Sequence, residues 1–181
     1  MMIGNLVTVP ARQHPELLAP SVARALAAVS GENVLVAEIH PAAADTVTFC
    51  QRYAVPVEAS ANCVVVAGRR GNQTTLAACV ALATTRIDVN GVVRRHLGAR
   101  KASFASMEIA VEATGMEYGG ITPFGLPPQW PLLVDARVVV TSRLVVGSGV
   151  RRSKLVVPGP VLAALPGVVV LDHLATSAAS G

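Results

Sequence analysis

The segment Tyr118-Gly119-Gly120-Ile121-Thr122-Pro123-Phe124-Gly125-Leu126-Pro127 is the most unusual stretch of this sequence. Its glycines and prolines fix an irregular backbone path, because glycine reaches conformations closed to other residues and proline holds one backbone angle. Adjacent glycines also let a backbone approach a ligand closely and direct N–H groups at a carbonyl, an ester oxygen or a phosphate. Taken alone, the segment is also typical of a tight turn between a helix and a strand.

Outward from this segment, short helices and strands follow each other irregularly. Ser106–Thr114 before it is predicted to be a helix, with Ser106 as its N-cap and Gly115 at its end. The other predicted helices are Pro20–Val29 (ended by Gly31), His40–Tyr53, a helix capped by Asp88 and running to Leu97, and Pro160–Leu165. The predicted strands are 33–39, 62–67, 74–84, 101–104, 132–135, 138–141, 144–146, 155–157 and 168–171, with a hairpin turn at 68–72. Because no regular βαβ alternation appears, we expect one α+β domain over residues 1–181, with a curved mixed sheet carrying helices.

Composition narrows the class of protein. The chain has 181 residues, of which 52% are hydrophobic and only 14% are charged, against a usual charged share of about 25%. This excludes a disordered chain. No apolar run approaches the ~18 residues that a membrane-spanning helix needs, and no secretory signal precedes the first apolar residues. The three cysteines (Cys50, Cys63 and Cys79) are an odd number without a C-x-x-C pair, so we expect free thiols in a reducing cytoplasm.

Several kinds of catalytic chemistry find no support in the residue pattern. The four histidines (His14, His40, His96 and His173) lack metal-ligand spacing, so neither a metal nor another cofactor is expected. Gly147-Ser148-Gly149-Val150 lacks the Lys-Ser/Thr pair of a phosphate-binding loop and the flanking residues of a serine-hydrolase elbow. Cys63 lies in an apolar strand with no histidine fixed nearby, so we interpret it as a buried structural thiol.

Three motifs in a fixed order carry a resemblance to a known family. They are the segment Gly119–Gly125, then Leu133-Val134-Asp135, then Gly147-Ser148-Gly149 before Arg151-Arg152. Over roughly residues 45–175 the chain resembles the YbaK/prolyl-tRNA-synthetase-associated family of aminoacyl-tRNA editing domains. The resemblance implies a single domain whose curved mixed sheet forms a partial barrel with flanking helices. It also implies a free-standing deacylase without a cofactor, which hydrolyses the ester of mischarged aminoacyl-tRNA and has an aminoacyl-tRNA synthetase as a further candidate partner.

The resemblance also assigns residues to the site. It places the aminoacyl pocket at Gly119 and Pro123, with Asp135 and the Gly-rich turn nearby. We expect the amides of Gly119 and Gly120 to stabilise the oxyanion and Asp135 to orient a group or a water molecule. The expected pocket residues are Asn62, Ile121, Thr122, Pro123, Gly147, Ser148 and Gly149. Ordinary turn chemistry also accounts for Asp135 at a strand end and for Ser148 between two glycines, and a local loop bond accounts for Thr122.

One departure from the family pattern bears on activity. The family usually carries a lysine at the start of the strand that matches 62–67, where this chain has Ala61 and Asn62. Asn62 donates and accepts hydrogen bonds but carries no charge. Arg69, Arg70 and Lys101 are candidate substitutes. The alternative to a deacylase is therefore a catalytically weakened module of the same fold, which binds tRNA ends or a small ligand.

Basic residues gather in three clusters in a chain of net charge +4. The clusters are Arg69-Arg70, then Arg94-Arg95 with Arg100-Lys101, then Arg151-Arg152 with Lys154. With an RNA substrate they are candidate phosphate contacts, and without one they are typical of a solvated face. The aromatic residues in and near the segment 118–127 are few (Tyr118, Phe124 and Trp130), so we expect recognition of tRNA shape and of the acceptor end rather than of base sequence.

Overall fold

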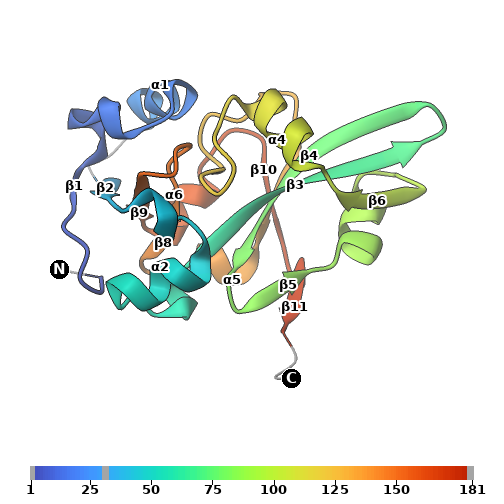
Figure 1. The fold of residues 1–181 in the computed structure, drawn as a ribbon. Coiled ribbons are helices and arrows are strands. Elements are labelled where there is room, and N and C mark those ends of the chain that lie inside the picture. Colours follow the sequence, from blue (N-terminus) through green and yellow to red (C-terminus); the bar gives the residue numbers. More distant parts are fainter. Residues whose placement is uncertain (1–2, 30–32, 179–181) are drawn as a thin grey trace.

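The computed structural model describes residues 3–29 and 33–178, and these residues form the predicted α+β domain (Figure 1). A four-stranded sheet has the order β1-β2-β9-β8, with bounds Val9–Pro10, Leu35–Glu38, Ser153–Val157 and Leu144–Gly147. A five-stranded sheet has the order β10-β7-β4-β3-β6, with bounds Val168–Leu171, Leu132–Asp135, Gln73–Leu82, Ala61–Arg70 and Lys101–Phe104. A third pair joins β11 (Ala175–Ser177) to β5 (Thr85–Ile87). The strands of the described residues form several sheets and no closed barrel.

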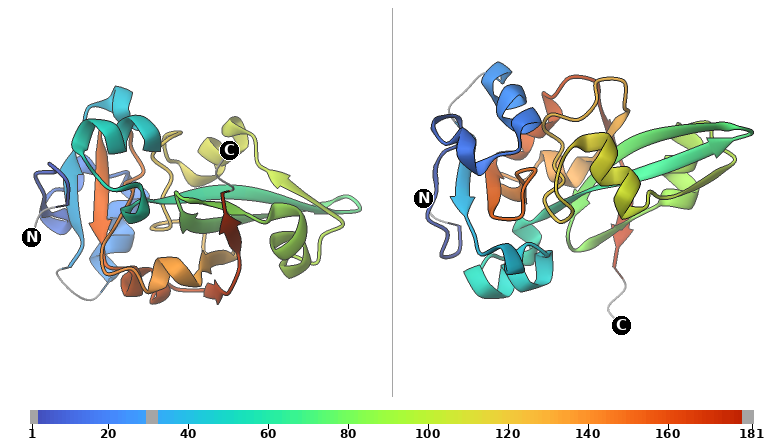
Figure 2. Two further views of the ribbon diagram at one scale, coloured as in Figure 1. Left: turned by 90° about the horizontal axis from the view of Figure 1, so that it is seen from below. Right: turned by 45° about the horizontal axis from the view of Figure 1, so that its top comes forward.

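The hairpin of β3 and β4 is the longest feature of the fold. Its pairing runs from Ala61 opposite Leu82 to Arg70 opposite Gln73, so the turn is only Gly71-Asn72 and is shorter than predicted. Figures 1 and 2 show the hairpin extending away from the smaller sheet, with α4 on one side and α3 on the other. Because β7 runs parallel to β4 while β3 runs antiparallel to it, the sheet is mixed, as predicted.

Local capping signals place most of the helices. Ser106 Oγ accepts from the Ile109 N–H (3.3 Å) to begin α4, and Gly115 ends it in the left-handed region at φ +67°. Asp88 caps a π-helix through the N–H groups of Gly91 and Val92, and the chain continues as a short α-helix. The helices are α1 (Pro20–Ala28), α2 (Thr46–Tyr53), η5 (Val89–Val93), α3 (Arg94–His96), α4 (Met107–Thr114), α5 (Ala136–Val139) and α6 (Gly159–Ala163), with 3₁₀ turns at Ala11–Gln13, Pro15–Leu17, Pro41–Ala43 and Val57–Ala59. Gly31 lies outside the described residues.

Two predicted elements were wrong, both because a carboxylate caps a helix. The valine-rich run 138–141, predicted as a strand, instead forms the end of α5 and the turn after it, because Asp135 Oδ1 accepts from the Arg137 N–H (3.0 Å) and starts a helix. The predicted helix from His40 to Tyr53 is divided into a 3₁₀ turn and α2, because Asp45 Oδ1 accepts from the Thr48 N–H (3.0 Å).

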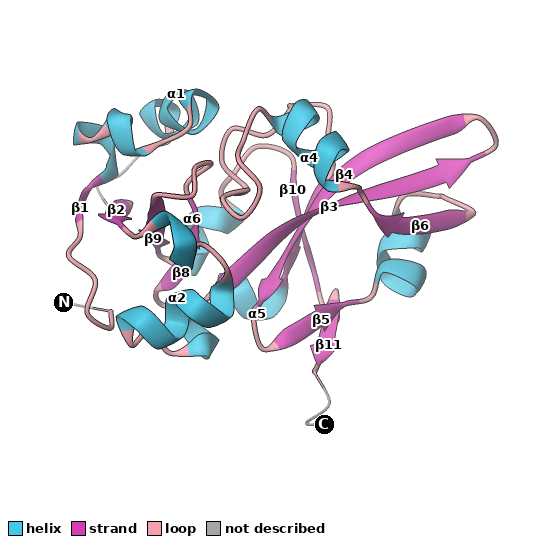
Figure 3. Cartoon of the chain, in the orientation of Figure 1, coloured by secondary structure: helices cyan, strands magenta, loops and turns pink. Residues whose placement is uncertain are grey.

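The central loop between α4 and β7 is held by the main core, although Figure 3 shows it without regular structure. Phe124 and Met116 are fully buried in the largest apolar cluster, together with Val22 of α1, Leu155 of β9 and Val134 of β7. Because these side chains come from both sheets and from α1, the loop is packed against the body of the domain rather than free on its surface.

Candidate active site

A cavity of about 370 Å³ opens between α2, the first half of β3, α4 and the central loop. Its volume lies within the ~300–1,000 Å³ typical of small-molecule sites. The residues that line it are Ala44, Asp45, Thr46, Ala61, Asn62, Cys63, Val64, Val65, Phe104, Ala105, Met107, Ala110, Tyr118, Gly119, Ile121, Gly147 and Lys154. Five parts of the chain that lie apart in sequence thus meet in one place: the cap of α2, the start of β3, the start of α4, the central loop and the end of β8.

Lys154 of β9 is the most unusual residue of this cavity. Its side chain is only 8% exposed, and its Nζ donates to the carbonyls of Ala44 (2.8 Å) and Gly119 (3.3 Å). The ammonium also lies 5.7 Å from the centre of the Phe49 ring. Burial, as the larger cause, and the charge of Arg151 together lower the pKa of Lys154 to about 8, against the opposing effects of Asp45 and Cys50. In the sequence Lys154 belongs to a basic cluster typical of a solvated face or of phosphate contacts, whereas in the structure it is a buried cation that links two loops.

The central loop presents Gly119, not Gly120, to the cavity. Gly119 has a φ of +85°, its carbonyl accepts from Lys154, and its N–H has no hydrogen-bond partner within the described residues. Gly120 is absent from the lining, and its N–H donates to the Glu117 carbonyl (2.9 Å). A Cβ at Gly120 would stand 2.7 Å from the Val150 carbonyl oxygen, so this glycine is required by packing. Of the two glycines expected to supply oxyanion donors, only Gly119 lines the cavity.

The Gly-rich turn after β8 is joined to the central loop by backbone hydrogen bonds. Gly149 donates its N–H to the Gly120 carbonyl (2.7 Å), and Glu117 donates its N–H to the Gly149 carbonyl (2.9 Å). Ser148 is fully buried, with its Oγ 3.0 Å from the Ser153 carbonyl and 3.1 Å from the Val150 carbonyl. Of the three residues expected to contact substrate here, only Gly147 lines the cavity.

The remaining expected pocket residues divide in two. Asn62 and Ile121 line the cavity, and Thr46 Oγ1 donates to Asn62 Oδ1 (2.8 Å), which leaves the Asn62 amide N–H groups as donors. Thr122 and Pro123 do not line it. Thr122 is fully buried with no partner for its hydroxyl among the described residues, and Pro123 faces a separate apolar hollow beside Trp130.

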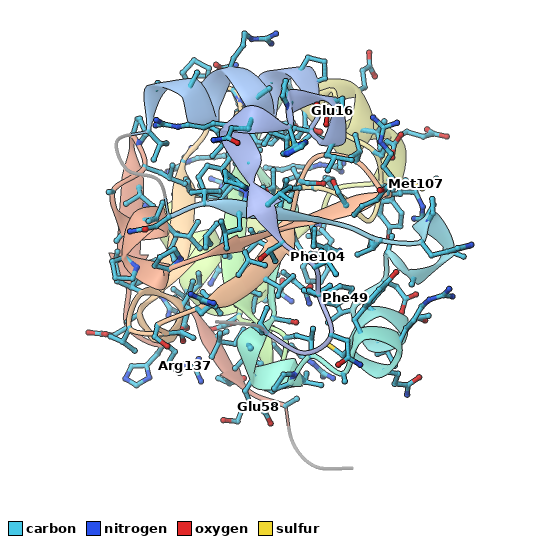
Figure 4. The ribbon with its side chains drawn as sticks, turned by 90° about the vertical axis from the view of Figure 1, so that its left-hand side faces the viewer. Glu16, Phe49, Glu58, Phe104, Met107 and Arg137 are labelled. Carbon is cyan, nitrogen blue, oxygen red and sulfur yellow. The ribbon has the colours of Figure 1, made fainter. Side chains whose placement is uncertain are left out.

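Asp135 lies outside the cavity lining and its carboxylate is fully engaged. It accepts from the Arg137 side chain (2.8 and 3.0 Å) and from the Ala175 N–H (2.9 Å), and so ties β11 to the end of β7. Although burial alone would raise it, these hydrogen bonds hold the pKa of Asp135 below its ordinary value. Figure 4 shows Arg137 well apart from Phe104 and Met107 of the cavity. Asp135 therefore takes no part in the mechanism proposed below.

Cys63 and Cys79 do not supply a thiolate. Cys50, Cys63 and Cys79 are free thiols, and Cys63 lines the cavity among apolar side chains. Although Cys63 is partly accessible from the cavity, burial raises its pKa, and burial also raises the pKa of Cys79 to about 12. Both thiols are therefore protonated at neutral pH. In the described ranges 3–29 and 33–178, no three His, Cys, Asp or Glu side chains gather as a metal site would require.

The predicted basic clusters differ in how far they are already engaged. Arg151 donates to the carbonyls of Tyr118 (3.0 Å) and Pro41 (3.1 Å), and Arg152 donates to the Glu16 carbonyl. Arg70 donates to the Gly98 carbonyl (3.1 Å). A second group, formed by Arg69, Arg94, Arg100 and Lys101, lines its own hollow of about 430 Å³, and Arg95 is exposed outside it.

Comparison with known proteins finds one family and several solved structures that are similar to this chain. The family model for the aminoacyl-tRNA editing domain matches residues 40–165. A search of curated proteins found no relative that matches the chain. Three solved structures are similar: a candidate trans-editing enzyme for prolyl-tRNA synthetase (TM-score 0.71, 23% identity, 86% of this chain and 97% of that one), a scaffold protein from epitope backbone grafting by computational design (0.71, 22%, 86% and 97%) and the hypothetical protein APE2540 (0.67, 22%, 76% and 88%). At these identities the likeness concerns the fold. No helix of the described residues is long and apolar enough to cross a membrane.

Proposed function

Because this chain belongs to the family of aminoacyl-tRNA editing domains, we propose that it hydrolyses in trans the ester bond of mischarged aminoacyl-tRNA. The observation that carries the proposal is the cavity in which the ammonium of Lys154, the amide of Asn62 and the loop glycine Gly119 come together. Such a substrate places the protein in the cytoplasm, with an aminoacyl-tRNA synthetase as a further candidate partner.

An aminoacyl ester is already activated, so positioning and charge stabilisation suffice without a strong nucleophile. In the proposed reaction a water molecule attacks the ester carbonyl carbon, and negative charge develops on the carbonyl oxygen. The Gly119 N–H and the ammonium of Lys154 stabilise this oxygen. The ester C–O bond then breaks, and the ribose oxygen leaves with a proton that originates from the attacking water.

Lys154 supplies a positive charge in place of the family lysine that is missing at the start of β3. Asn62, which stands at or next to that position, lines the same cavity as Lys154, although Lys154 comes from β9. The positive charge is therefore supplied from another strand. This favours an active deacylase over the alternative, a weakened binding module of the same fold.

The cavity fits a small uncharged amino acid. Ala61, Val65, Ala110 and Ile121 form its apolar walls, and Asp45 is the one acidic residue among the described residues that line it. The carboxylate of Asp45 is engaged at the N-terminus of α2. A larger side chain would compete with the terminal ribose for a volume of about 370 Å³.

A single-turnover deacylation assay with a panel of mischarged tRNAs tests the proposal. We expect at least one tRNA carrying a small amino acid to be hydrolysed well above the uncatalysed rate. Binding of these tRNAs without hydrolysis of any of them would instead establish the binding-module alternative.

Asn62→Ala is expected to slow deacylation by roughly ten- to a hundredfold, the cost of one neutral hydrogen bond of about 1–3 kcal/mol. The reason is that the Asn62 amide, oriented by Thr46, is a free donor at the cavity. Single-turnover rates measure the effect, with folding checked by circular dichroism. Thr46→Val is the matched control, because it releases the amide without removing it and should cost less. A normally folded Asn62→Ala protein with an unchanged rate would remove Asn62 from the site.

Cys63→Ser is expected to leave the deacylation rate unchanged, because the thiol is protonated at neutral pH and the mechanism does not use it. The exchange should lower the free energy of unfolding by about 1 kcal/mol, because it places a hydroxyl among apolar side chains. Rate and denaturant unfolding are measured on the same preparation. A folded variant that loses several orders of magnitude in rate would establish a thiol mechanism instead.

A further inference from the structure

A basic notch lies farther along β3 and β6, the two strands that also contribute residues to the cavity. The notch is the hollow of about 430 Å³ lined by Arg69 of β3, Arg100 and Lys101 at the start of β6, and Asn90 and Arg94 of the adjoining helices. No acidic side chain lines it, and none of its cations forms an ion pair with another described residue. Four cations around one hollow without counter-charges form a site for an anionic ligand.

These cations differ from the other arginines near the cavity. The guanidinium groups of Arg151 and Arg152 donate hydrogen bonds to backbone carbonyls of neighbouring loops. Arg94 makes one such bond through Nε to the Asn90 carbonyl (2.7 Å). The side chains of Arg69 and Lys101 are exposed and form no hydrogen bond within the described residues. The notch therefore offers most of its donors to a ligand.

Large exposed side chains stand at the mouth of the cavity, at the other end of β6. Phe104, Met107 and Tyr118 line the cavity, yet they are 58%, 55% and 57% exposed. Figure 4 labels Phe104 and Met107 among the side chains of this region. Phe104 and Tyr118 carry aromatic rings. Aromatic rings that remain open to solvent near clustered cations are platforms on which nucleic-acid bases stack.

Strand β6 connects the two features and sets their spacing. It begins at Lys101 in the notch and ends at Phe104 at the cavity mouth, and Arg69 and Val66 of β3 stand opposite these two residues. Three residues of strand span about 10 Å, which matches about three stacked nucleotides at a rise of ~3.4 Å each. Because side chains three residues apart leave opposite faces of a strand, a nucleic-acid strand that contacts both Lys101 and Phe104 must cross the edge of the sheet. Because β6 is the edge strand of its sheet, no further strand of the described residues pairs with its outer side.

We propose that the edge of β6 binds the unpaired 3′ end of the tRNA. The terminal base stacks on Phe104 beside the cavity that takes the aminoacyl group, and the phosphates a few nucleotides before it lie in the basic notch. This inference rests on the proposed function for its substrate. It adds the direction in which the acceptor strand crosses the protein and selects one of the basic clusters as its contact.

Binding of uncharged tRNA tests the inference separately from hydrolysis. Intact tRNA is compared with the same tRNA lacking its last three nucleotides, over a range of salt concentrations. Phe104→Ala is expected to weaken binding of intact tRNA about tenfold through loss of base stacking. Lys101→Gln is expected to reduce the salt slope by about 0.7, the value for one phosphate contact on a single strand. Neither variant should weaken the binding of truncated tRNA further.

Arg86→Gln is the matched control, since it removes one exposed charge from β5, outside the notch. It should leave the difference between intact and truncated tRNA unchanged, and Phe104→Trp should preserve it by keeping a ring. Equal losses on intact and truncated tRNA, or no loss on either, would overturn the inference. A wild-type protein that binds tRNA in this pattern but hydrolyses no aminoacyl ester would overturn the proposed function and leave this inference standing.

Discussion

Lys154→Met is expected to lower kcat/KM for deacylation by about 10²–10³-fold, the usual cost of removing one preorganised donor to a developing oxyanion. The side chain lengths are similar, so the cavity keeps its shape while it loses its cation. The ammonium also holds the carbonyls of Ala44 and Gly119, and therefore positions the loop that carries the second donor. Single-turnover kinetics on the preferred tRNA measure the effect.

The pH profile separates a catalytic charge from a merely structural contact. Because the pKa of Lys154 is lowered to about 8, the wild-type rate corrected for spontaneous hydrolysis should fall as the pH rises through about 8. The profile of the Lys154→Met variant should lack this descending limb. The chain contains two lysines, Lys101 and Lys154, so NMR of labelled lysine can assign the titration directly. An unchanged wild-type rate between pH 7 and 9, with Lys154 shown to titrate in that range, would contradict the role.

Stability provides the control for this variant. A pKa below the ordinary value of 10.5 means that folded Lys154 binds its proton more weakly than the unfolded chain does. The free energy of unfolding therefore gains a contribution as pH rises from about 8 to about 10.5, on the order of 3 kcal/mol in full. Lys154→Met lacks it. The contribution is read from the difference between the two proteins, because the buried thiols affect both equally.

The sequence predicted those elements whose signals lie within a few residues. The caps at Ser106 and Asp88 and the glycine end at Gly115 are local hydrogen-bonding and backbone effects, and the structure confirms them. The family resemblance and the α+β fold are likewise confirmed. The strand prediction for 138–141 was wrong. The β-branched residues of this run favour a strand, but the carboxylate of Asp135 was enough to start a helix just before it.

The candidate site was harder to predict, because its key contacts come from strand order. Lys154 is buried because β9 lies between β2 and β8, and no local pattern records that arrangement. Arg151 and Arg152 lie three and two residues before this lysine in sequence, so charge clustering indicated a surface. The one available signal was a lone lysine at the entrance to the apolar strand 155–157. Similarly, adjacent glycines mark a close approach, but only the structure shows that Gly120 packs on Val150 while Gly119 faces the cavity.

Gly147→Ala is expected to disable the site through the loop rather than through direct contact with substrate. A Cβ at this position would stand 2.3 Å from the Gly120 carbonyl oxygen and 2.4 Å from that of Ile121, so the central loop must move. Overpacking of this kind costs about 1–3 kcal/mol of stability. A movement of about 1 Å at the Gly119 amide lowers the rate by roughly a hundredfold. Deacylation kinetics and denaturant unfolding of one preparation give both quantities.

Gly167→Ala is the matched control for this prediction, because Gly167 has a φ of +71° and, apart from its chain neighbours, no described residue has an atom within 4 Å of an added Cβ. It should lose about 1–2 kcal/mol through backbone strain alone and keep the wild-type rate. The same geometry predicts that Gly120→Val destabilises the fold itself, since its Cβ would meet the Val150 backbone at 2.7 Å. If Gly147→Ala retains full activity with the same loss of stability as Gly167→Ala, then the position of the loop does not control the reaction, and Gly119 loses its assignment as an oxyanion donor.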